Sequence, residues 1–534
     1  MQSSRTTTSR RVRRKAAAAL AAAALSAPLL LASGTPATAA PSPAKEGAKL
    51  ARKLVDRTSA EGAKRHLEVF QAIAERYDGN RAAGTKGHLR SAQYAAALLK
   101  AAGYDVTFQE FAFTYVETLA ERLTVLSPEE REIPIRLMTY TKSTPEGGVE
   151  AAVAPVPVDE DESTGCTAED YASGDYEGKI ALIQRGGCTF AEKQAAAAEA
   201  GAVAAVVYNN TEGDLNGTLG SVADARIPTG GISQEDGEAL AAAAEDGEVR
   251  INLEIREFQE ERTTPNVIAE TPGGDPDNVV MFGAHLDSVT DGPGINDNGS
   301  GSAGLLEAAL QLAKADPAGR HANKVRFALW SAEELGLQGA EHYVAQLSEE
   351  ERERIALYLN YDMIASPNYG VFVYDGDDSD GEGAGPGPAG SEVLERDITA
   401  FLASRGVETR GTDFDGRSDY GPFIEAGIPS GGTFTGAEGI KTAEEAALWG
   451  GTEGEAYDGC YHQACDDLDN IDMTALDLNV KAIAHVLGTY AWDTSAVAAA
   501  AEAGDEAGEA RTVAARQAAD AARSGHGHGP RVTA

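Results

Sequence analysis

Five short segments of this chain carry residue types that bind divalent metals. In order they are His285-Leu286-Asp287, residues 294–298, residues 331–334, Asn360-Tyr361-Asp362 and Tyr461-His462. Two imidazoles and three carboxylates could hold two metal ions if one carboxylate were shared, and Glu333 would remain as a separate base. This set of residues predicts metal-assisted hydrolysis, which needs ligands, an activated water and a proton acceptor.

Each segment also has a simpler interpretation when it is taken alone. Residues 294–301 could be a capped turn at the start of a helix. Glu333-Glu334 could be a solvated helix start, and Tyr461-His462 an ordinary surface loop. The glycine-rich turn lacks the Lys-Ser/Thr ending of a phosphate-binding loop. The position of several segments directly after apolar runs favours the metal site.

The elements that must position these residues alternate between strand and helix from about residue 265. Apolar runs predict strands over residues 279–284, 325–330 and 355–361, and a helix over 301–313. We therefore expect an α/β fold with a mixed, mostly parallel sheet flanked by helices. The carboxyl ends of such strands share one edge, so these ends are expected to bring together His285, Glu333, Glu334 and Asp362.

Residues 148–256 have a different character. Strands are predicted over 179–183 and 203–208, separated by a helix over 191–200 that Gly201 caps. The run 178–190, followed by Ala200-Gly201-Ala202 and Tyr208-Asn209-Asn210, resembles a protease-associated (PA) domain. The resemblance implies a β-rich α+β insert without catalytic residues, of a kind found in several secreted peptidase families.

The five segments together resemble peptidase family M28, in particular its secreted bacterial (streptomycete-type) zinc aminopeptidases. The resemblance covers about residues 61–495 apart from the insert, and implies the fold of the zinc exopeptidases. It implies two zinc ions per chain. One would be bound by His285, Asp297 and Asp362, and the other by Asp297, Glu334 and His462.

The same resemblance assigns further roles at the site. Glu333 would be the general base, Tyr461 would stabilise the oxyanion, and Asp287 would support His285. The free α-amine of the substrate would contact Glu333, Asp362 and the main-chain oxygen of Arg417. Met363 and Phe434 would line the pocket for the first side chain, although ordinary core packing explains each of them almost as well.

Two positions depart from the family pattern. Tyr420 stands where close relatives often have histidine, which could alter the rim of the pocket. Some relatives bind calcium through two carboxylates late in the domain. Asp477 matches one of them but Lys481 replaces the other, so Ca²⁺ is a doubtful expectation.

The resulting hypothesis is a secreted two-zinc aminopeptidase that removes apolar N-terminal residues with the help of water activated between the metals. A carboxypeptidase-like exopeptidase would need a cationic clamp, for which Arg417 is the only obvious candidate. A one-zinc glutaminyl cyclase would lack one of the paired ligands, and none is missing. A binding protein with a PA domain and an inactive peptidase fold is disfavoured by the intact ligands and Glu333.

Length, charge and the N-terminus bound the remaining possibilities. The chain has 534 residues and a formal charge of -39. This charge disfavours binding to nucleic acids and to membrane surfaces. The expected partners are peptides, and the chain is expected to be a monomer. Residues 1–39 have the basic start, the apolar stretch and the Ala37-Thr38-Ala39 site of a signal peptide, and the export route is undecided.

We expect a linker or pro-segment over 40–60, and a discontinuous peptidase domain over 61–147 and 257–495. The PA domain is expected over 148–256 and a disordered tail over 496–534.

The chain contains four cysteines. An even number in an exported chain favours disulfides over thiol chemistry. Locality favours the pairs Cys166–Cys188 and Cys460–Cys465. A thiolate metal site is the alternative, but no Cys-x-x-Cys motif is present.

Overall fold

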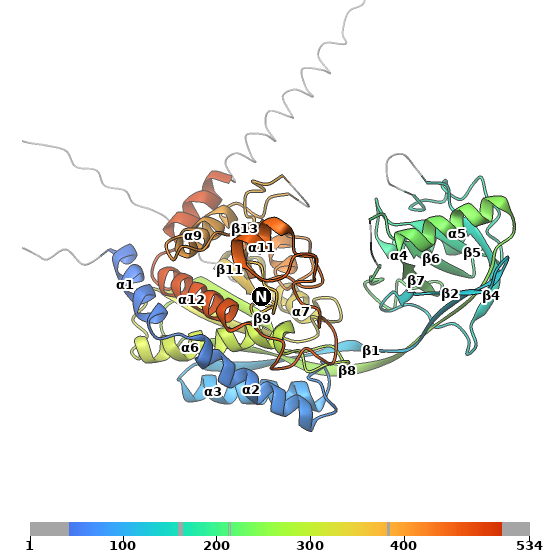
Figure 1. The fold of residues 1–534 in the computed structure, drawn as a ribbon. Coiled ribbons are helices and arrows are strands. Elements are labelled where there is room, and N and C mark those ends of the chain that lie inside the picture. The colour runs from blue at the N-terminus through green and yellow to red at the C-terminus, as the bar shows by residue number, and fades with distance from the viewer. Residues whose placement is uncertain (1–41, 159–163, 212, 214, 382–384, 505–534) are drawn as a thin grey trace, which may run out of the picture. The chain divides into compact units, whose positions relative to one another are not determined.

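The computed structural model describes residues 42–158, 164–211, 213, 215–381 and 385–504 (Figure 1). The predicted signal peptide, residues 1–39, lies outside these ranges, as does the predicted tail beyond residue 504. In the part of the chain that is described, no helix combines the length and apolar character needed to cross a bilayer.

Four parallel strands form the centre of the peptidase sheet. They are β9 (Asp275–His285), β10 (Asn323–Trp330), β11 (Ile355–Tyr361) and β14 (Ser430–Phe434), in the spatial order β14-β11-β9-β10. Strand β12 (Phe372–Tyr374) is antiparallel to β14, β13 (Arg410–Thr412) is parallel to β12, and β8 (Arg250–Glu270) is antiparallel to β10. The predicted mixed, mostly parallel sheet is therefore confirmed.

The order of the strands places a switch point at β9. Strand β10 lies on one side of β9 and β11 on the other, although both follow it in sequence. Chain segments that leave the carboxyl ends of these strands diverge there, which opens a crevice at that edge. The metal-binding residue types of the sequence fall at this edge.

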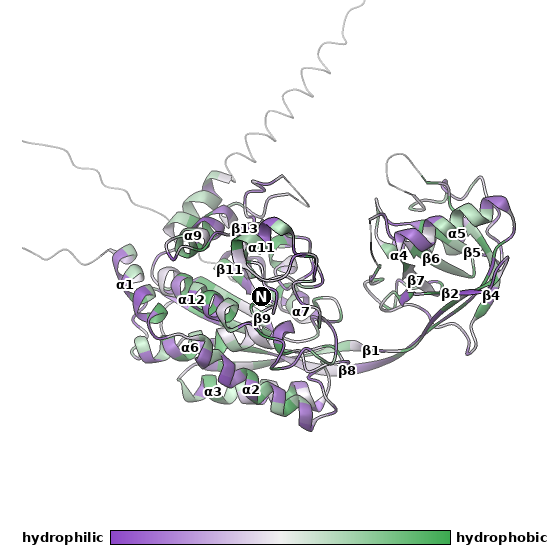
Figure 2. Ribbon diagram, viewed as in Figure 1, coloured by the Kyte–Doolittle hydropathy of each residue, from purple (hydrophilic) through white to green (hydrophobic). Residues whose placement is uncertain are grey.

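Both faces of the sheet are buried, and each central strand alternates between two cores. On β9, Val280, Phe282 and Ala284 belong to the core under helices α6 (Gly301–Ala315) and α12 (Met473–Tyr490), and Met281 belongs to the core on the opposite face. A strand covered on both sides is apolar throughout, which explains the continuous runs in the sequence and in Figure 2.

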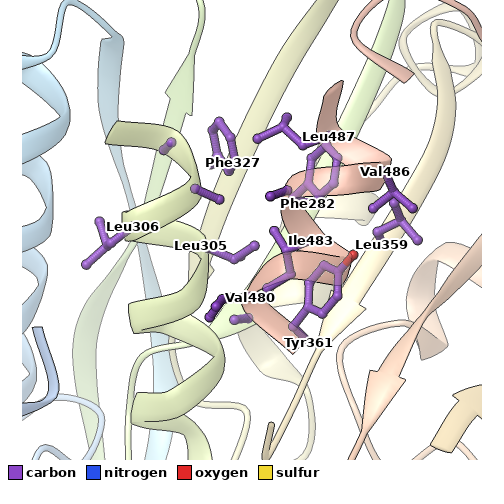
Figure 3. Packing of buried hydrophobic residues seen from close by; sticks show 14 of the residues in the cluster. Phe282, Leu305, Leu306, Phe327, Leu359, Tyr361, Val480, Ile483, Val486 and Leu487 are labelled. Atoms are coloured by element: carbon purple, nitrogen blue, oxygen red, sulfur yellow. The ribbon is translucent and has the colours of Figure 1, made fainter. Parts of the chain in front are cut away.

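The larger core is built from side chains of the sheet and of α6 and α12. Figure 3 shows Phe282 and Phe327 of the sheet beside Leu305 of α6 and Leu487 of α12. Because Phe282 is fully buried, its truncation to alanine would cost about 3–5 kcal/mol. This core fixes the strands whose ends carry the candidate site.

Further helices cover the two faces. They are α2 (Ala60–Arg76), α3 (Lys86–Ala101) and α9 (Ser391–Ala403) on the larger core, and α7 (Gln338–Gln346) and α10 (Gly421–Glu425) on the other. Short helices α8 (Glu349–Glu353) and α11 (Ala443–Trp449) lie in connections. Helix α3 begins at Lys86, because Thr85 caps it by accepting the His88 N–H.

Helices form in two segments that the sequence assigns to a linker or pro-segment and to the start of the tail. The stretch predicted as a linker or pro-segment contains helix α1 (Pro43–Val55), which buries Leu50, Ala51 and Leu54 beside α12. Residues 495–504, at the start of the predicted tail, are helical and bury Val497. In α1, widely spaced apolar residues within a polar stretch are enough to pack a helix against the core, whereas residues 495–504 are rich in alanine, which favours a helix by itself.

The insert continues from a long two-stranded ribbon. Strand β1 (Asp105–Ser127) pairs antiparallel with β8 from Asp105↔Glu270 to Ser127↔Arg250. The insert contains β2 (Arg131–Ile133), β3 (Arg136–Leu137), β4 (Val149–Pro155), β5 (Ile180–Gln184), β6 (Ala204–Tyr208), β7 (Thr229–Ile232), α4 (Phe190–Glu199) and α5 (Gln234–Asp246). Its core also includes Leu123 and Ile133, which precede the predicted boundary at residue 148.

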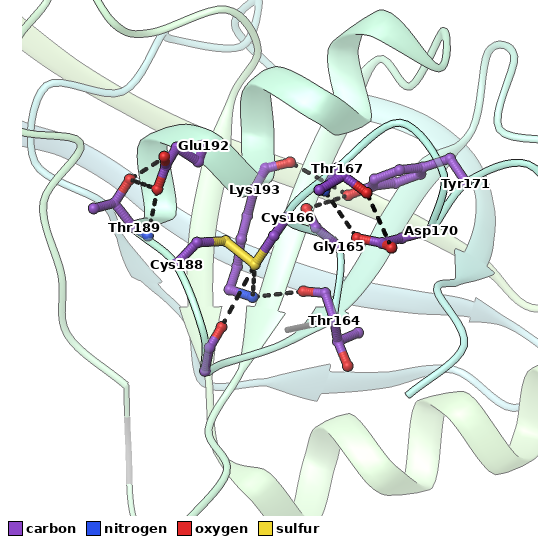
Figure 4. The surroundings of a disulfide bond; sticks show 11 residues. Thr164, Gly165, Cys166, Thr167, Asp170, Tyr171, Cys188, Thr189, Glu192 and Lys193 are labelled. Carbon is purple, nitrogen blue, oxygen red and sulfur yellow. Dashed lines mark hydrogen bonds between the residues drawn. A yellow bond between two sulfur atoms is a disulfide. The ribbon is translucent and has the colours of Figure 1, made fainter. Parts of the chain in front are cut away.

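The two predicted disulfides, Cys166–Cys188 and Cys460–Cys465, are both present. Figure 4 shows the first of them beside Lys193, whose ammonium donates to the Thr164 carbonyl at 2.5 Å. Burial lowers the pKa of Lys193 to about 8. The second disulfide closes the loop that contains Tyr461 and His462.

Candidate active site and metal centre

The ends of three neighbouring strands deliver the candidate ligands to one place. His285 is the last residue of β9, Asp362 directly follows β11, and Glu333 and Glu334 follow β10 by three and four residues. Asp297 arrives from the turn between β9 and α6. The apolar runs that precede these residues in the sequence predict this meeting of strand ends.

The first group of ligand atoms contains His285, Asp297 and Asp362. Nε2 of His285 lies 3.2 Å from Oδ1 of Asp297 and 3.3 Å from Oδ1 of Asp362. All three residues are buried. The Oδ1 atom of Asp362 has no hydrogen-bond partner among the described residues.

The second group contains Asp297, Glu334 and His462. Nε2 of His462 lies 3.1 Å from Oδ2 of Asp297 and 3.0 Å from Oε2 of Glu334. The two oxygens of Asp297 thus face two different groups. The His462 side chain is 41% exposed, whereas that of His285 is 1% exposed, so the second group is the more accessible.

Both groups have the chemistry and spacing that zinc requires. Zinc bonds of 2.0–2.1 Å in a tetrahedral site put neighbouring ligand atoms about 3.3 Å apart, close to the four separations given above. Nitrogen and carboxylate oxygen are ordinary zinc ligands. In each group one buried carboxylate oxygen lacks a hydrogen bond within the described chain, Asp362 Oδ1 in the first and Glu334 Oε1 in the second.

A third group of acidic residues lacks these features. Asp375, Asp377 and Glu395 lie close enough to share an ion. However, the Asp375 carboxylate already accepts main-chain N–H groups, among them those of Ser379 and Asp380. The third group contains no imidazole, and hydrogen bonds within its own loop account for the arrangement of its carboxylates.

The first two groups form a strongly coupled set of charges. Burial alone would raise the pKa of Asp297, but hydrogen bonds with His285 and His462 hold it below its usual value. Burial disfavours the charged form of His285, but Asp362 and Glu333 outweigh it and raise the pKa of this imidazole. Burial raises the pKa of Glu334 to about 7, with Asp297 adding to the effect.

Glu333 lies beside both groups without belonging to either. Its Oε2 is 3.8 Å from Nε2 of His285, and the residue is 9% exposed. Burial, reinforced by Asp362 and Asp419, raises its pKa well above the usual range. A carboxylate with a raised pKa at the edge of a cavity suits proton transfer.

Asp287 is fully buried behind His285. Nδ1 of His285 lies 3.3 Å from the main-chain oxygen of Asp287 and 3.7 Å from its Oδ1. The carboxylate also accepts the Glu333 N–H at 3.4 Å. Asp287 therefore contacts both the imidazole and the turn that carries Glu333.

Tyr461 and Arg417 meet at the opening of the site. The Tyr461 ring stacks on His462 with 3.8 Å between the ring centroids, and its hydroxyl accepts from Nη2 of Arg417 at 3.3 Å. Arg417 also pairs with Glu438 at 2.9 Å. Burial, with Asp297 nearby, raises the pKa of Tyr461, so its hydroxyl keeps its proton.

A cavity of about 320 Å³ adjoins the ligand groups. Met363 and Phe434 line it, as predicted for the substrate pocket, together with Leu337, Tyr374 and Tyr420. Asp413 and Asp415 line it as well, and the Tyr420 hydroxyl donates to Asp415 at 2.6 Å. Asp477, of the doubtful calcium site, is ion-paired with Lys481.

A chain of buried hydrogen bonds that ends on Asp362 was not identified from the sequence. Trp330 Nε1 donates to the Tyr358 hydroxyl, which donates to Oδ1 of Asn360, at 2.9 Å each. Asn360 donates to Ser418 at 2.8 Å, and Ser418 donates to Oδ2 of Asp362 at 2.6 Å. The available signal was the position of Ser418 next to Arg417.

Asp466 was also missed. Its two oxygens accept the main-chain N–H groups of Asn296 at 2.8 Å and Asp297 at 3.0 Å. Asn470 bridges Asp466 to Asp458, which accepts the Cys460 N–H at 2.8 Å. The disulfide loop and the Asp297 turn are thus joined by one network, for which the sequence held only the proximity of Asp466 to Cys465.

Comparison with known proteins gives consistent matches. The model of Peptidase family M28 matches residues 266–487, and that of the PA domain matches residues 149–240. An aminopeptidase of Pseudomonas aeruginosa is 43% identical over 448 residues, which cover 81% of each chain. Leucine aminopeptidase 2 of Trichophyton rubrum is 42% identical over 427 residues, 80% of this chain and 83% of the relative.

Two solved structures share the fold. The aminopeptidase from Aneurinibacillus sp. strain AM-1 has a TM-score of 0.63 and 29% identity, covering 82% of this chain and 95% of its own. BSAP, a zinc aminopeptidase from Bacillus subtilis, has a TM-score of 0.55 and 28% identity, covering 80% and 94%.

Proposed function

The chain belongs to peptidase family M28 and is an aminopeptidase, and from this premise we propose that it uses two zinc ions to remove apolar N-terminal residues from peptides. The observation that carries the proposal is Asp297, whose two oxygens face two separate histidine–carboxylate groups. A carboxylate shared between two such groups can hold two metal ions the short distance apart that a two-metal site needs.

The two groups of ligand atoms are the proposed zinc positions. His285, Asp297 and Asp362 would hold one ion, and Asp297, Glu334 and His462 the other. Bound zinc would supply Lewis acidity, which polarises the scissile carbonyl and makes water a better nucleophile at neutral pH. The Ser418 hydroxyl donates to Asp362, and the Asp466 carboxylate accepts from the main chain of the Asp297 turn. These hydrogen bonds would hold the ligands in place.

Glu333 is the proposed general base. It takes a proton from the attacking water and returns it to the leaving amine, which leaves the carboxylate ready for the next turnover. Tyr461 is the proposed oxyanion donor, since its hydroxyl retains its proton and lies at the opening of the site. Asp287 supports both His285 and the turn of Glu333.

The substrate's free α-amine would contact Glu333, Asp362 and the main-chain oxygen of Arg417. The first side chain would enter the cavity between Met363 and Phe434. Among the described residues that line this cavity, Arg417 is the only arginine or lysine, and its guanidinium is paired with Glu438. This pairing weakens the carboxypeptidase alternative, which would need a cationic group available for a carboxylate.

We also propose that the enzyme works outside the cytoplasm. The two disulfides suit an oxidising compartment, and a short loop disulfide beside a metal ligand would be vulnerable in a reducing one. Expression with and without residues 1–39, followed by assay of the medium, would test export. Equal amounts in the medium would contradict the signal-peptide assignment.

The decisive experiment replaces the proposed base and counts the metal. Glu333→Gln should retain two zinc ions and lower kcat by about 10²–10⁴-fold. Glu341→Gln, on α7, is the matched control and should keep parental turnover. Activity of Glu333→Gln within tenfold of the parent would remove Glu333 as the base, and one zinc per parental chain would contradict the two-metal site.

A substrate panel tests the specificity. Leucyl and methionyl p-nitroanilides should be hydrolysed, whereas their N-acetylated forms should not. Because Asp413 and Asp415 also line the cavity, the panel includes the lysyl compound. Faster hydrolysis of the lysyl compound would overturn the apolar preference, and hydrolysis of blocked compounds would overturn the requirement for a free amine.

A further inference from the structure

Arg81 is a fully buried arginine in the connection between α2 and α3. Its Nε donates to the Pro293 carbonyl at 2.9 Å, Nη1 donates to the Leu286 carbonyl, and Nη2 donates to the Gly294 carbonyl. Its main-chain N–H donates to Oγ of Ser288 at 2.9 Å. One residue therefore contacts the chain at four points between positions 286 and 294.

These contacts join the two segments that carry proposed ligands. Leu286 directly follows His285, and Gly294 precedes Asp297 by three residues. The planar guanidinium bonds both at once, which fixes their separation in a way that a single-point donor cannot. Asn80, the preceding residue, adds a bond from Nδ2 to the Thr290 carbonyl at 3.1 Å.

The turn before Asp297 packs tightly around the guanidinium. Gly294 has φ +61, and a Cβ atom there would lie 2.4 Å from the Asp297 carbonyl oxygen and 3.2 Å from Nη2 of Arg81. Such contacts leave no room for a side chain, so glycine is required for both the conformation and the close approach. The Phe70 ring lies on the guanidinium, 5.1 Å from Cζ to the ring centroid.

The charge of Arg81 is compensated by the site itself. The described residues show no ion pair within 4 Å that includes Arg81, because its hydrogen bonds go to carbonyl groups. Burial lowers its pKa to about 10, opposed by the carboxylates of Asp287, Asp466, Glu334 and Asp297. A buried charge is costly without opposite charge nearby, so Arg81 favours the arrangement in which these carboxylates stay close.

We propose that Arg81 is a positioning residue that holds the His285 and Asp297 segments at the correct separation for zinc before the metal binds. The proposal rests on the proposed two-zinc site. Its role is in the affinity for zinc, since Arg81 reaches neither the cavity nor the proposed ligand atoms. Residues that orient metal ligands in this way typically contribute 10–100-fold in metal affinity or activity.

The test is the zinc affinity of Arg81→Lys in the full chain, measured by competition with a chromogenic chelator. Lysine keeps the charge and loses the fork, so the variant should bind zinc about 10–100-fold more weakly. Excess zinc should restore most of kcat. The matched control is Arg326→Lys, because Arg326 is a largely buried arginine that pairs with Glu270 away from the site; it should keep parental zinc affinity.

Each outcome decides the matter. A folded Arg81→Lys variant with parental zinc affinity overturns the proposal, as does an equal loss in Arg326→Lys. If Arg81→Lys does not fold, Ser288→Ala decides, since it leaves the guanidinium in place and removes the acceptor of the Arg81 N–H, together with the bonds that the Ser288 hydroxyl donates to the Val289 and Gly292 carbonyls. It should weaken zinc binding severalfold, and an unchanged affinity would overturn the proposal. Fewer than two zinc ions in the parent would instead refute the proposed function.

Discussion

The disulfide between Cys460 and Cys465 holds the loop that supplies His462, and its removal should weaken zinc binding unequally at the two positions. The His462 side chain is far more exposed than that of His285. Its backbone has φ +57, a left-handed conformation that a residue with a Cβ adopts only when its surroundings enforce it. The short disulfide loop provides that constraint.

The magnitude follows from the length of the loop. For a sequence separation of five residues, the chain-entropy relation gives about 7 cal/mol/K, or about 2 kcal/mol at 25 °C. If zinc binding must order the opened loop, this corresponds to about 30-fold in affinity. The bond from Cys460 N–H to Asp458 still restrains the loop, so we expect a loss of about 5- to 30-fold.

The assay is zinc titration of the Cys460→Ser/Cys465→Ser double variant against a chromogenic chelator, with kcat followed as a function of zinc concentration. The dissociation constant of the weaker zinc position should rise by about 5- to 30-fold, and that of the tighter position by less than about threefold. Saturating zinc should restore kcat. The control is Cys166→Ser/Cys188→Ser, which removes a disulfide of the insert and should leave both constants unchanged.

Two results would refute the reasoning. Equal weakening of both zinc positions would show that the loop acts on the whole site. An unchanged dissociation constant at the weaker zinc position would show that the Asp458 and Asp466 network orders His462 without the disulfide.

Three further predictions concern single residues. Tyr461→Phe should lower kcat about 10²–10³-fold with little change in KM, because an oxyanion donor acts in the transition state; a change in KM alone would exclude that role. Ser418→Ala removes the hydrogen bond to Asp362 and should weaken zinc binding about tenfold or more in chelator competition, whereas parental affinity would show the bond is dispensable. Burial, with Arg65 and Lys314 nearby, lowers the pKa of His66 to about 4. Folding therefore favours the neutral imidazole. The zinc-free protein should lose up to about 3 kcal/mol of stability as pH falls from 6.5 to 4. Urea unfolding of His66→Gln should lack most of that loss, and an unchanged pH dependence would contradict it.

Much of the fold at the site could be predicted because the central strands are buried on both faces. Their sequences are continuous apolar runs, and the run over 355–361 coincides with β11. Polar residues that follow such runs lie at the carboxyl edge of a parallel sheet. His285 and Asp362 could therefore be placed near each other without knowledge of the tertiary structure.

The ribbon of β1 and β8 was predicted only in part. Phe108, Phe111 and Phe113 indicate a strand only over the first half of this segment, whereas β1 extends over 23 residues. Beyond the core its side chains are largely polar and partly exposed on both faces, so hydrophobic alternation is weak. Pairing with β8 extends the strand through main-chain hydrogen bonds, which are independent of side-chain pattern.

Residue types and local spacing determined which side chains can bind metal and act as a base, because ligand chemistry belongs to the side chain itself. Only the tertiary structure decided which oxygen of Asp297 faces which histidine, and that Ser418 and Asp466 bond to the site. It also brings Arg81 to its four acceptors, each of which lies more than 200 residues away in the sequence. Such contacts depend on how distant loops pack, and nothing in the sequence around Asn80-Arg81 distinguishes them from an ordinary polar turn.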